Sequence, residues 1–125
     1  MRYLILFILL FLTACSIAKE EGQVVRVIDG DTFVLDTNEH VRLLCVNTPE
    51  KGEPFHDEAG VYLESITLNQ NVTLERDYQD KDKYGRLLRY VYVNNQSVNA
   101  LVAKSGMARP LVIFPNGKKC DELWE

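Results

Sequence analysis

Three short runs in this 125-residue chain carry side chains suited to phosphodiester chemistry. They are Asp29-Gly30-Asp31-Thr32, the segment from Arg42 to Glu50, and Asp82-Lys83-Tyr84-Gly85-Arg86. Together they supply oxygen ligands for a metal ion, one candidate general base and two arginines. Such a set could bind Ca²⁺ and a phosphate and activate a water molecule for attack on phosphorus.

Asp31, Asn47 and Thr48 are the candidate calcium ligands. Asp31 follows a predicted strand and a glycine turn, so its carboxylate can project from the rim of a sheet. Asn47 and Thr48 end another predicted strand, and Ca²⁺ accepts amide and backbone oxygens as readily as carboxylates. Asp29-Gly30-Asp31 is also simply a good turn, in which glycine permits positive φ and the aspartates bond to local amides. Both interpretations of Asp31 remain open at this point.

Arg42, Arg86 and Glu50 are the candidate catalytic residues. Two guanidinium groups could hold a phosphate and stabilise the negative charge that develops as water attacks. Glu50 follows the rigid Pro49 and could accept a proton from that water. Two of these residues also have an ordinary interpretation, because Arg42 could be a solvent-facing strand residue and Glu50 an exposed loop carboxylate.

The elements that must position these residues are short strands and two helices. β-branched and aromatic runs predict five strands, and an apolar repeat at helical spacing predicts a helix over Phe55–Leu68. Ser97 is a suitable N-cap for a second short helix, which ends before Gly106. This order predicts a mainly β (α+β) fold, a five-stranded OB-fold Greek-key barrel with two or three attached helices. The predicted strands are 23–28, 32–36, 40–46, 71–76 and 87–93.

The three runs, in this order, resemble the staphylococcal nuclease (thermonuclease) family, an OB-fold group of calcium-dependent nucleases. The resemblance extends from about Val24 to about Pro115. It implies hydrolysis of DNA and RNA to 3′-phosphorylated products. The roles that it implies are metal binding for Asp31, Asn47 and Thr48, catalysis for Arg42, Glu50 and Arg86, and substrate binding for Asp82, Lys83 and Tyr84.

Two features depart from the pattern of that family, and one aromatic position is uncertain. Asn47 stands where the family usually has a second calcium-binding aspartate, so we expect a functional site with weak calcium affinity. The segment Asp121–Glu125 looks like only the first turn of the family's third helix, and we therefore expect low stability without calcium and nucleotide. Phe114 is the candidate for the family's nucleotide-stacking aromatic, with core packing as the alternative.

The N-terminal segment predicts export from the cytoplasm. Leu4–Leu12 is an unbroken apolar run, too short for a membrane-spanning helix, and Leu12-Thr13-Ala14-Cys15 resembles a lipoprotein cleavage box. The predicted organisation is a signal peptide over 1–14, a tether over 15–22 and a nuclease-like domain over 23–125. Cys15 would anchor the chain to a membrane through a lipid, on the extracytoplasmic side. An ordinary signal peptide that happens to contain Cys15 is the alternative, and it would give a secreted protein.

Charge and cysteine content limit the possible partners. The net charge is −4, so any nucleic-acid binding must rely on a local basic region. Cys45 and Cys120 could form a disulfide outside the cytoplasm, but the apolar neighbours of Cys45 favour a buried free thiol. We expect a monomeric calcium-dependent endonuclease acting on DNA and RNA. The alternative is an OB module that binds nucleic acid or a protein without cutting.

Overall fold

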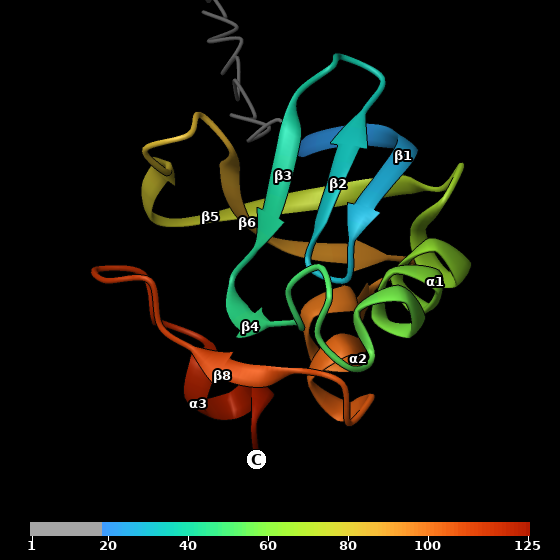
Figure 1. The fold of residues 1–125 in the computed structure, drawn as a ribbon. Coiled ribbons are helices and arrows are strands. Elements are labelled where there is room, and N and C mark those ends of the chain that lie inside the picture. The colour runs from blue at the N-terminus through green and yellow to red at the C-terminus, as the bar shows by residue number, and fades with distance from the viewer. Residues whose placement is uncertain (1–18) are drawn as a thin grey trace, which may run out of the picture.

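The computed structural model describes residues 19–125 and confirms the predicted barrel (Figure 1). Five strands form it, and β7 (Gln96–Ser97) extends the sheet beyond β6. Their order is β3-β2-β1-β5-β6, and a pairing of β3 with β6 closes the sheet. The strands of the barrel are β1 (Glu20–Asp29), β2 (Thr32–Leu35), β3 (His40–Leu43), β5 (Asn71–Lys81) and β6 (Leu87–Val93).

Closure depends on a single parallel pairing in an otherwise antiparallel barrel. β1 pairs with both β2 and β5, and β5 pairs with β6, all antiparallel. β3 then runs parallel to β6, with Val41 opposite Leu87 and Leu43 opposite Arg89. A closed sheet leaves few unpaired backbone groups at its edges. The barrel thus gives rigid support to the chain segments that leave its rim.

Three helices and a second small sheet gather at one end of the barrel (Figure 1). The helices are α1 (His56–Thr67), α2 (Val98–Lys104) and α3 (Cys120–Leu123), and β4 (Cys45–Asn47) pairs with β8 (Arg109–Leu111). Ser97 caps α2 as predicted, since its side chain accepts a hydrogen bond from the backbone N–H of Ala100 at 3.1 Å. Ala59 and Leu63 on α1 are buried in the core.

The hydrophobic core has two parts. The larger part fills the barrel and the space under α1 and α2, and Phe33, Leu43 and Val91 are among its fully buried members. The smaller part lies beneath α3 and includes Leu44, Tyr90 and Leu123. Where only one face of a strand is covered, buried and exposed residues alternate along it; where both faces are covered, successive residues are all buried.

The predicted third strand, 40–46, is in fact two strands. The strand ends after Leu43, where the pairing with β2 stops. Cys45 has a φ of 72°, and this turn directs β4 toward β8. Positive φ is uncommon for a residue with a side chain, so composition gave no sign of this turn. The break redirects Asn47 to the end of the barrel where the helices lie.

The cysteine prediction and one domain boundary are corrected. Cys45 and Cys120 form a disulfide, so the expectation of a buried free thiol was wrong. Their Cα atoms lie 5.2 Å apart although 75 residues separate them, a proximity that only the fold creates. The predicted tether also ends too late, because Glu20, Glu21 and Gly22 pair with β5 as part of β1.

The segment around α3 is held to the barrel by more than the disulfide. The Trp124 indole N–H donates to the carbonyl of Cys45 at 2.8 Å, and Lys119 Nζ lies 2.7 Å from a carboxylate oxygen of Glu75. Phe114 is 89% exposed, so the alternative of core packing for this ring is wrong. None of the helices within residues 19–125 is long and apolar enough to cross a membrane. The predicted signal peptide and Cys15 lie outside the described residues.

Candidate active site

Asp31 lies buried at the rim of the barrel, with both carboxylate oxygens bonded. Oδ1 accepts from the hydroxyl of Thr32 at 3.0 Å, and Oδ2 accepts from the backbone N–H and the hydroxyl of Thr48 at 3.0 and 3.1 Å. Burial would raise the pKa of Asp31, but the charge of Arg42 and these hydrogen bonds outweigh it and the pKa falls below its ordinary value. Asp31 is therefore held ionised.

Gly30 allows this close packing. A Cβ on Gly30 would lie 2.6 Å from the Cβ of Ala59 and 2.8 Å from two side-chain atoms of Thr48. Its φ lies outside the left-handed region, so the expectation that this glycine serves positive φ was wrong. The glycine is needed because Ala59 of α1 and the Thr48 side chain approach the turn closely.

Arg42 is buried, not solvent-facing, and joins two of the predicted metal ligands. Its Nη1 donates to the carbonyls of Leu43 and Val46 at 2.6 and 2.8 Å, which holds the bend between β3 and β4. Its Nη2 lies 3.3 Å from Asp31 Oδ2 and donates to Asn47 Oδ1 at 3.3 Å. Burial lowers the pKa of Arg42, Asp31 raises it and the nearby Arg86 lowers it. The guanidinium stays charged, because even a lowered arginine pKa lies far above neutrality.

Asp29 is a site residue that the sequence did not single out. Its Oδ1 accepts from the backbone N–H of Asp31 at 3.1 Å, so two carboxyl groups lie side by side. Burial and the charge of Asp31 raise the pKa of Asp29 to about 6. The signal was present in the sequence, since the spacing Asp-Gly-Asp at a strand end places both side chains at one turn.

The oxygen donors at this rim fit a calcium ion. Within residues 19–125 no three His, Cys, Asp or Glu side chains form a metal-binding cluster, so a metal site must draw on amide and backbone oxygens as well. Asp29, Asp31 and the amide oxygen of Asn47 converge here, and the carbonyl of Thr48 follows directly in the chain. This is the hard, all-oxygen set that Ca²⁺ prefers. A bound cation would lower the pKa of Asp29, which burial and the charge of Asp31 raise.

Glu50 lies on an exposed loop whose shape is fixed by short hydrogen bonds. The Glu50 N–H donates to Glu53 Oε1 at 2.7 Å, and the Glu53 N–H donates to the Glu50 carbonyl at 2.9 Å. The His56 Nδ1 donates to the carbonyl of Pro49 at 2.8 Å. The loop starts at Thr48, which contacts Asp31. These hydrogen bonds therefore hold the Glu50 backbone in one conformation near the rim.

Arg86 projects from a turn that Asp82 organises. Asp82 accepts from the N–H groups of Tyr84 and Arg86 at 2.9 and 3.0 Å, and from Arg86 Nε at 2.7 Å. Burial would raise the pKa of Asp82, but the backbone and side chain of Arg86 lower it overall. The Arg86 and Lys83 charges lie 5.4 and 5.1 Å from the centre of the Tyr84 ring, which is 71% exposed. Gly85 has a φ of 80°, as this turn requires.

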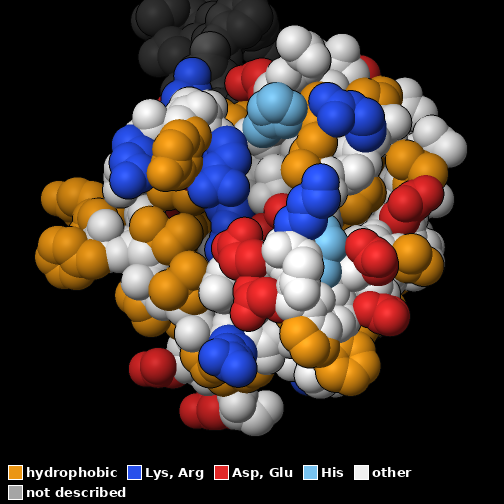
Figure 2. All heavy atoms as spheres, in the orientation of Figure 1, with side chains coloured by type: hydrophobic (Ala, Val, Ile, Leu, Met, Phe, Trp, Pro, Cys, Tyr) orange, Lys and Arg blue, Asp and Glu red, His pale blue; other side chains and the backbone are white. Residues whose placement is uncertain are grey.

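These residues form one face of the molecule. Figure 2 shows Lys and Arg side chains gathered over the β5–β6 turn beside β3, with acidic side chains next to them. The protein thus has a local basic region although its net charge is −4. Such a region is what nucleic-acid binding by an acidic protein needs. The structure brings Asp31, Arg42, Asn47 and Thr48 into contact, while Arg86 lies close enough to lower the pKa of Arg42.

Comparison with known sequences agrees with this arrangement. The model of the family described as staphylococcal nuclease homologue matches residues 40–125. The chain belongs to the staphylococcal nuclease family. The match covers β3 and β4, the Glu50 loop and the Arg86 turn, so most of the candidate site lies within it. Asp29 and Asp31 lie just before it, on the turn that precedes β2.

Individual members of the family are similar over most of this chain. It is 38% identical to the thermonuclease of Staphylococcus hyicus over 109 residues, 80% of this chain and 64% of that protein. It is 38% identical to the thermonuclease of Staphylococcus intermedius over 115 residues, 85% of this chain and 68% of that protein. It is also 38% identical to Endonuclease YncB of Bacillus subtilis over 109 residues, 78% of this chain and 52% of that protein. The chain thus spans between about half and two thirds of the length of these relatives.

Proposed function

We propose that this protein is a calcium-dependent endonuclease that hydrolyses DNA and RNA to 3′-phosphorylated products. One observation carries the proposal. The buried guanidinium of Arg42 lies 3.3 Å from both Asp31 and Asn47, so a phosphate-binding cation and the candidate metal ligands share one rim. Family membership supports a nuclease, and the all-oxygen donor set supports calcium.

In this proposal the two arginines bind the scissile phosphate. The contacts of Arg42 Nη2 at 3.3 Å are longer than the 2.7–2.9 Å of a strong charge-assisted hydrogen bond, so its N–H groups can be shared with a phosphate oxygen without rotation of the planar guanidinium. Its Nη1 stays bonded to the Leu43 and Val46 carbonyls and keeps the group oriented. Arg86 exchanges part of its pairing with Asp82 for the phosphate. Both charges stabilise the additional negative charge of the transition state.

The attacking water is oriented and deprotonated by the loop after β4. Bound Ca²⁺ would neutralise phosphate charge and lower the pKa of a nearby water. Asp31 and Asn47 would hold that ion together with the Thr48 carbonyl. The carboxylate of Glu50 accepts a proton from the water as its oxygen bonds to phosphorus, and the bond between phosphorus and the 5′-oxygen breaks. The leaving 5′-oxygen takes a proton from solvent, so one product ends in a 3′-phosphate and the other in a 5′-hydroxyl. The hydrogen bonds of the loop fix the Glu50 backbone, so less ordering is needed at the moment of reaction.

The test is cleavage of a labelled oligonucleotide by the purified protein with calcium or with chelator. We expect cleavage only with calcium, and a loss of at least a hundredfold in kcat/KM for Arg86→Ala. Arg26→Ala, which removes an exposed arginine from β1, is the matched control and should retain activity. Binding of the oligonucleotide without cleavage in calcium would instead support the module that binds and does not cut.

We further propose that Cys15 carries a lipid that tethers the enzyme to a membrane outside the cytoplasm, and that the enzyme is a monomer. The apolar run and the small residues before Cys15 support the anchor. The disulfide between Cys45 and Cys120 is in keeping with an oxidising compartment, because such bonds persist mainly outside the cytoplasm.

A further inference from the structure

A cavity of about 350 Å³ opens directly beside the candidate active site. It shares Asn47 and Thr48 with that site and extends to Phe55, Met107 and Arg109. The loop before α1 forms one wall, and the segment that joins α2 to β8 forms the other. Its volume falls within the range of about 300–1,000 Å³ in which small-molecule sites occur. None of the residues proposed for catalysis lines this cavity.

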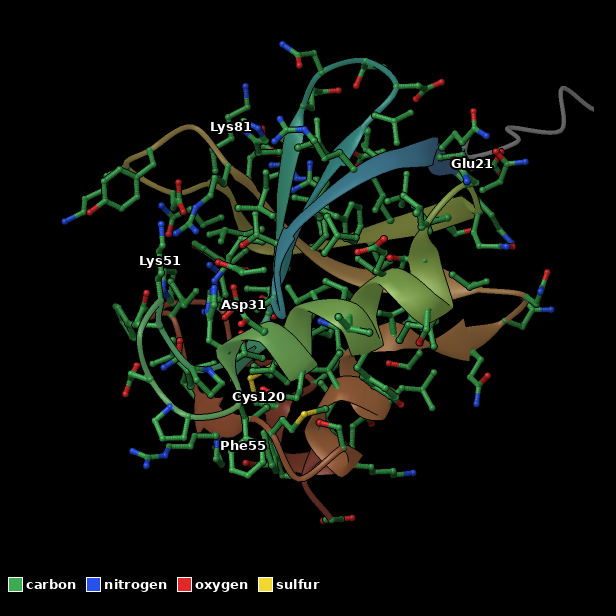
Figure 3. The ribbon with its side chains drawn as sticks, turned by 45° about the vertical axis from the view of Figure 1, so that its right-hand side comes forward. Glu21, Asp31, Lys51, Phe55, Lys81 and Cys120 are labelled. Atoms are coloured by element: carbon green, nitrogen blue, oxygen red, sulfur yellow. A yellow bond between two sulfur atoms is a disulfide. The ribbon has the colours of Figure 1, made fainter. Side chains whose placement is uncertain are left out.

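Phe55 presents an aromatic ring on the loop side of the cavity. The residue is 61% exposed and sits just before α1, at the foot of the loop that also carries Lys51 (Figure 3). Its φ of 69° is uncommon for a bulky residue and unfavourable, and strain of this kind is often kept at binding sites. Exposed aromatic faces are platforms for nucleobases, because every base can stack on them.

Arg109 presents a free cation on the opposite wall. It is the direct partner of Asn47 in the antiparallel β4–β8 pair, so the two side chains leave the same face of that small sheet. Within residues 19–125 its exposed guanidinium has no ion-pair or hydrogen-bond partner. A guanidinium in this position is suited to a phosphate.

Glu53 also lines the cavity and determines where a phosphate could lie. Its carboxylate accepts from the Glu50 N–H, so negative charge is fixed on the loop side. A phosphate would be repelled there and attracted to Arg109 across the cavity. The uncharged base is therefore placed at Phe55, and the phosphate at Arg109.

We propose that this cavity binds the nucleotide next to the scissile phosphate, with the base stacked on Phe55 and the next phosphate held by Arg109. The inference rests on the proposed function, which puts the scissile phosphate beside Arg42. The site would then have an aromatic ring and a cation on each side of the reacting phosphate. Tyr84 with Lys83 forms one pair, and Phe55 with Arg109 forms the other.

The test measures oligonucleotide binding separately from cleavage. The full chain is titrated into a fluorescein-labelled DNA strand of five thymidines in chelator, and the dissociation constant is read from anisotropy. We expect Phe55→Ala and Arg109→Ala each to weaken binding about tenfold, as loss of one base stack or one phosphate contact does. Tyr78→Ala and Arg26→Ala remove an exposed ring and an exposed arginine elsewhere and should bind within twofold of the wild type.

The outcomes separate this inference from the proposed function. Phe55→Trp should restore binding, which a merely structural role of the ring would not require, and thermal melting confirms that each variant is folded. Weaker binding by the two cavity variants supports the subsite even if calcium produces no cleavage. Absence of cleavage would contradict only the nuclease proposal. Wild-type binding by both folded variants overturns the subsite even if the protein cleaves DNA. Failure of the wild type to bind the strand overturns it as well.

Discussion

Replacing Asn47 with aspartate should strengthen calcium binding. The Asn47 amide oxygen lies 3.3 Å from Arg42 Nη2, which in turn lies 3.3 Å from Asp31 Oδ2. A carboxylate at this position adds one negative charge next to the candidate metal ligands. A unit charge pair about 4 Å apart contributes about 4 kcal/mol at an effective dielectric constant near 20.

Three effects in the structure oppose this gain. The new carboxylate must be desolvated, it repels Asp31, and it pairs with Arg42 while the metal is absent. We expect these effects to leave about 1.4 to 2.8 kcal/mol, which corresponds to a ten- to hundredfold lower dissociation constant for calcium. Without such a gain, the missing charge at position 47 would not limit metal affinity.

The measurement is calorimetric titration of calcium into wild type and Asn47→Asp, together with the calcium concentration that gives half-maximal cleavage. Asn38→Asp, in the exposed turn between β2 and β3, adds the same charge away from the site and is the matched control. The calcium dissociation constant and the calcium concentration for half-maximal cleavage should both fall for Asn47→Asp and stay unchanged for the control. Equal calcium dependence of the wild type and Asn47→Asp would refute the reasoning.

Three further predictions concern other parts of the chain. Arg42→Lys keeps the charge but removes the guanidinium that donates to two backbone carbonyls. We expect the cleavage rate to fall at least a hundredfold in kinetic assays and the free energy of unfolding in urea to fall by about 1–3 kcal/mol. A variant with normal kcat would contradict this. Reduction of the Cys45–Cys120 disulfide, which spans 75 residues, should lower the free energy of unfolding by about 4 kcal/mol, and an unchanged urea midpoint in reductant would argue against it. Cys15→Ser should abolish incorporation of labelled fatty acid in bacterial cells, whereas persistent labelling would exclude Cys15 as the anchor.

The barrel could be predicted from the sequence because its strands and helices have strong local signals. The β-branched runs at 23–28 and 87–93 are strands, and Ser97 caps α2 as expected. The break after Leu43 could not be predicted, since it depends on a left-handed backbone at Cys45 that nothing in its residue type favours. The fold overrides local preference at this point, and it is the point that directs Asn47 toward the site.

The candidate site was only partly predictable because burial and long-range contacts decide its chemistry. Alternation of strand faces could not show that Arg42 is 5% exposed, because β3 is covered on both sides at the rim. The disulfide joins residues that no local pattern links. The motifs gave the identities of the candidate residues, while the close packing at Gly30 and the hydrogen bonds from Thr48 to Asp31 emerge only when the turn meets Thr48 and α1.

The central claim is that this rim hydrolyses phosphodiester bonds with calcium. Its most direct test follows one labelled single-stranded DNA with the purified protein across a calcium titration, and determines the ends of the products. We predict cleavage that rises with calcium, stops in chelator and leaves 3′-phosphates. Intact DNA at saturating calcium, in the presence of folded protein, would contradict the claim.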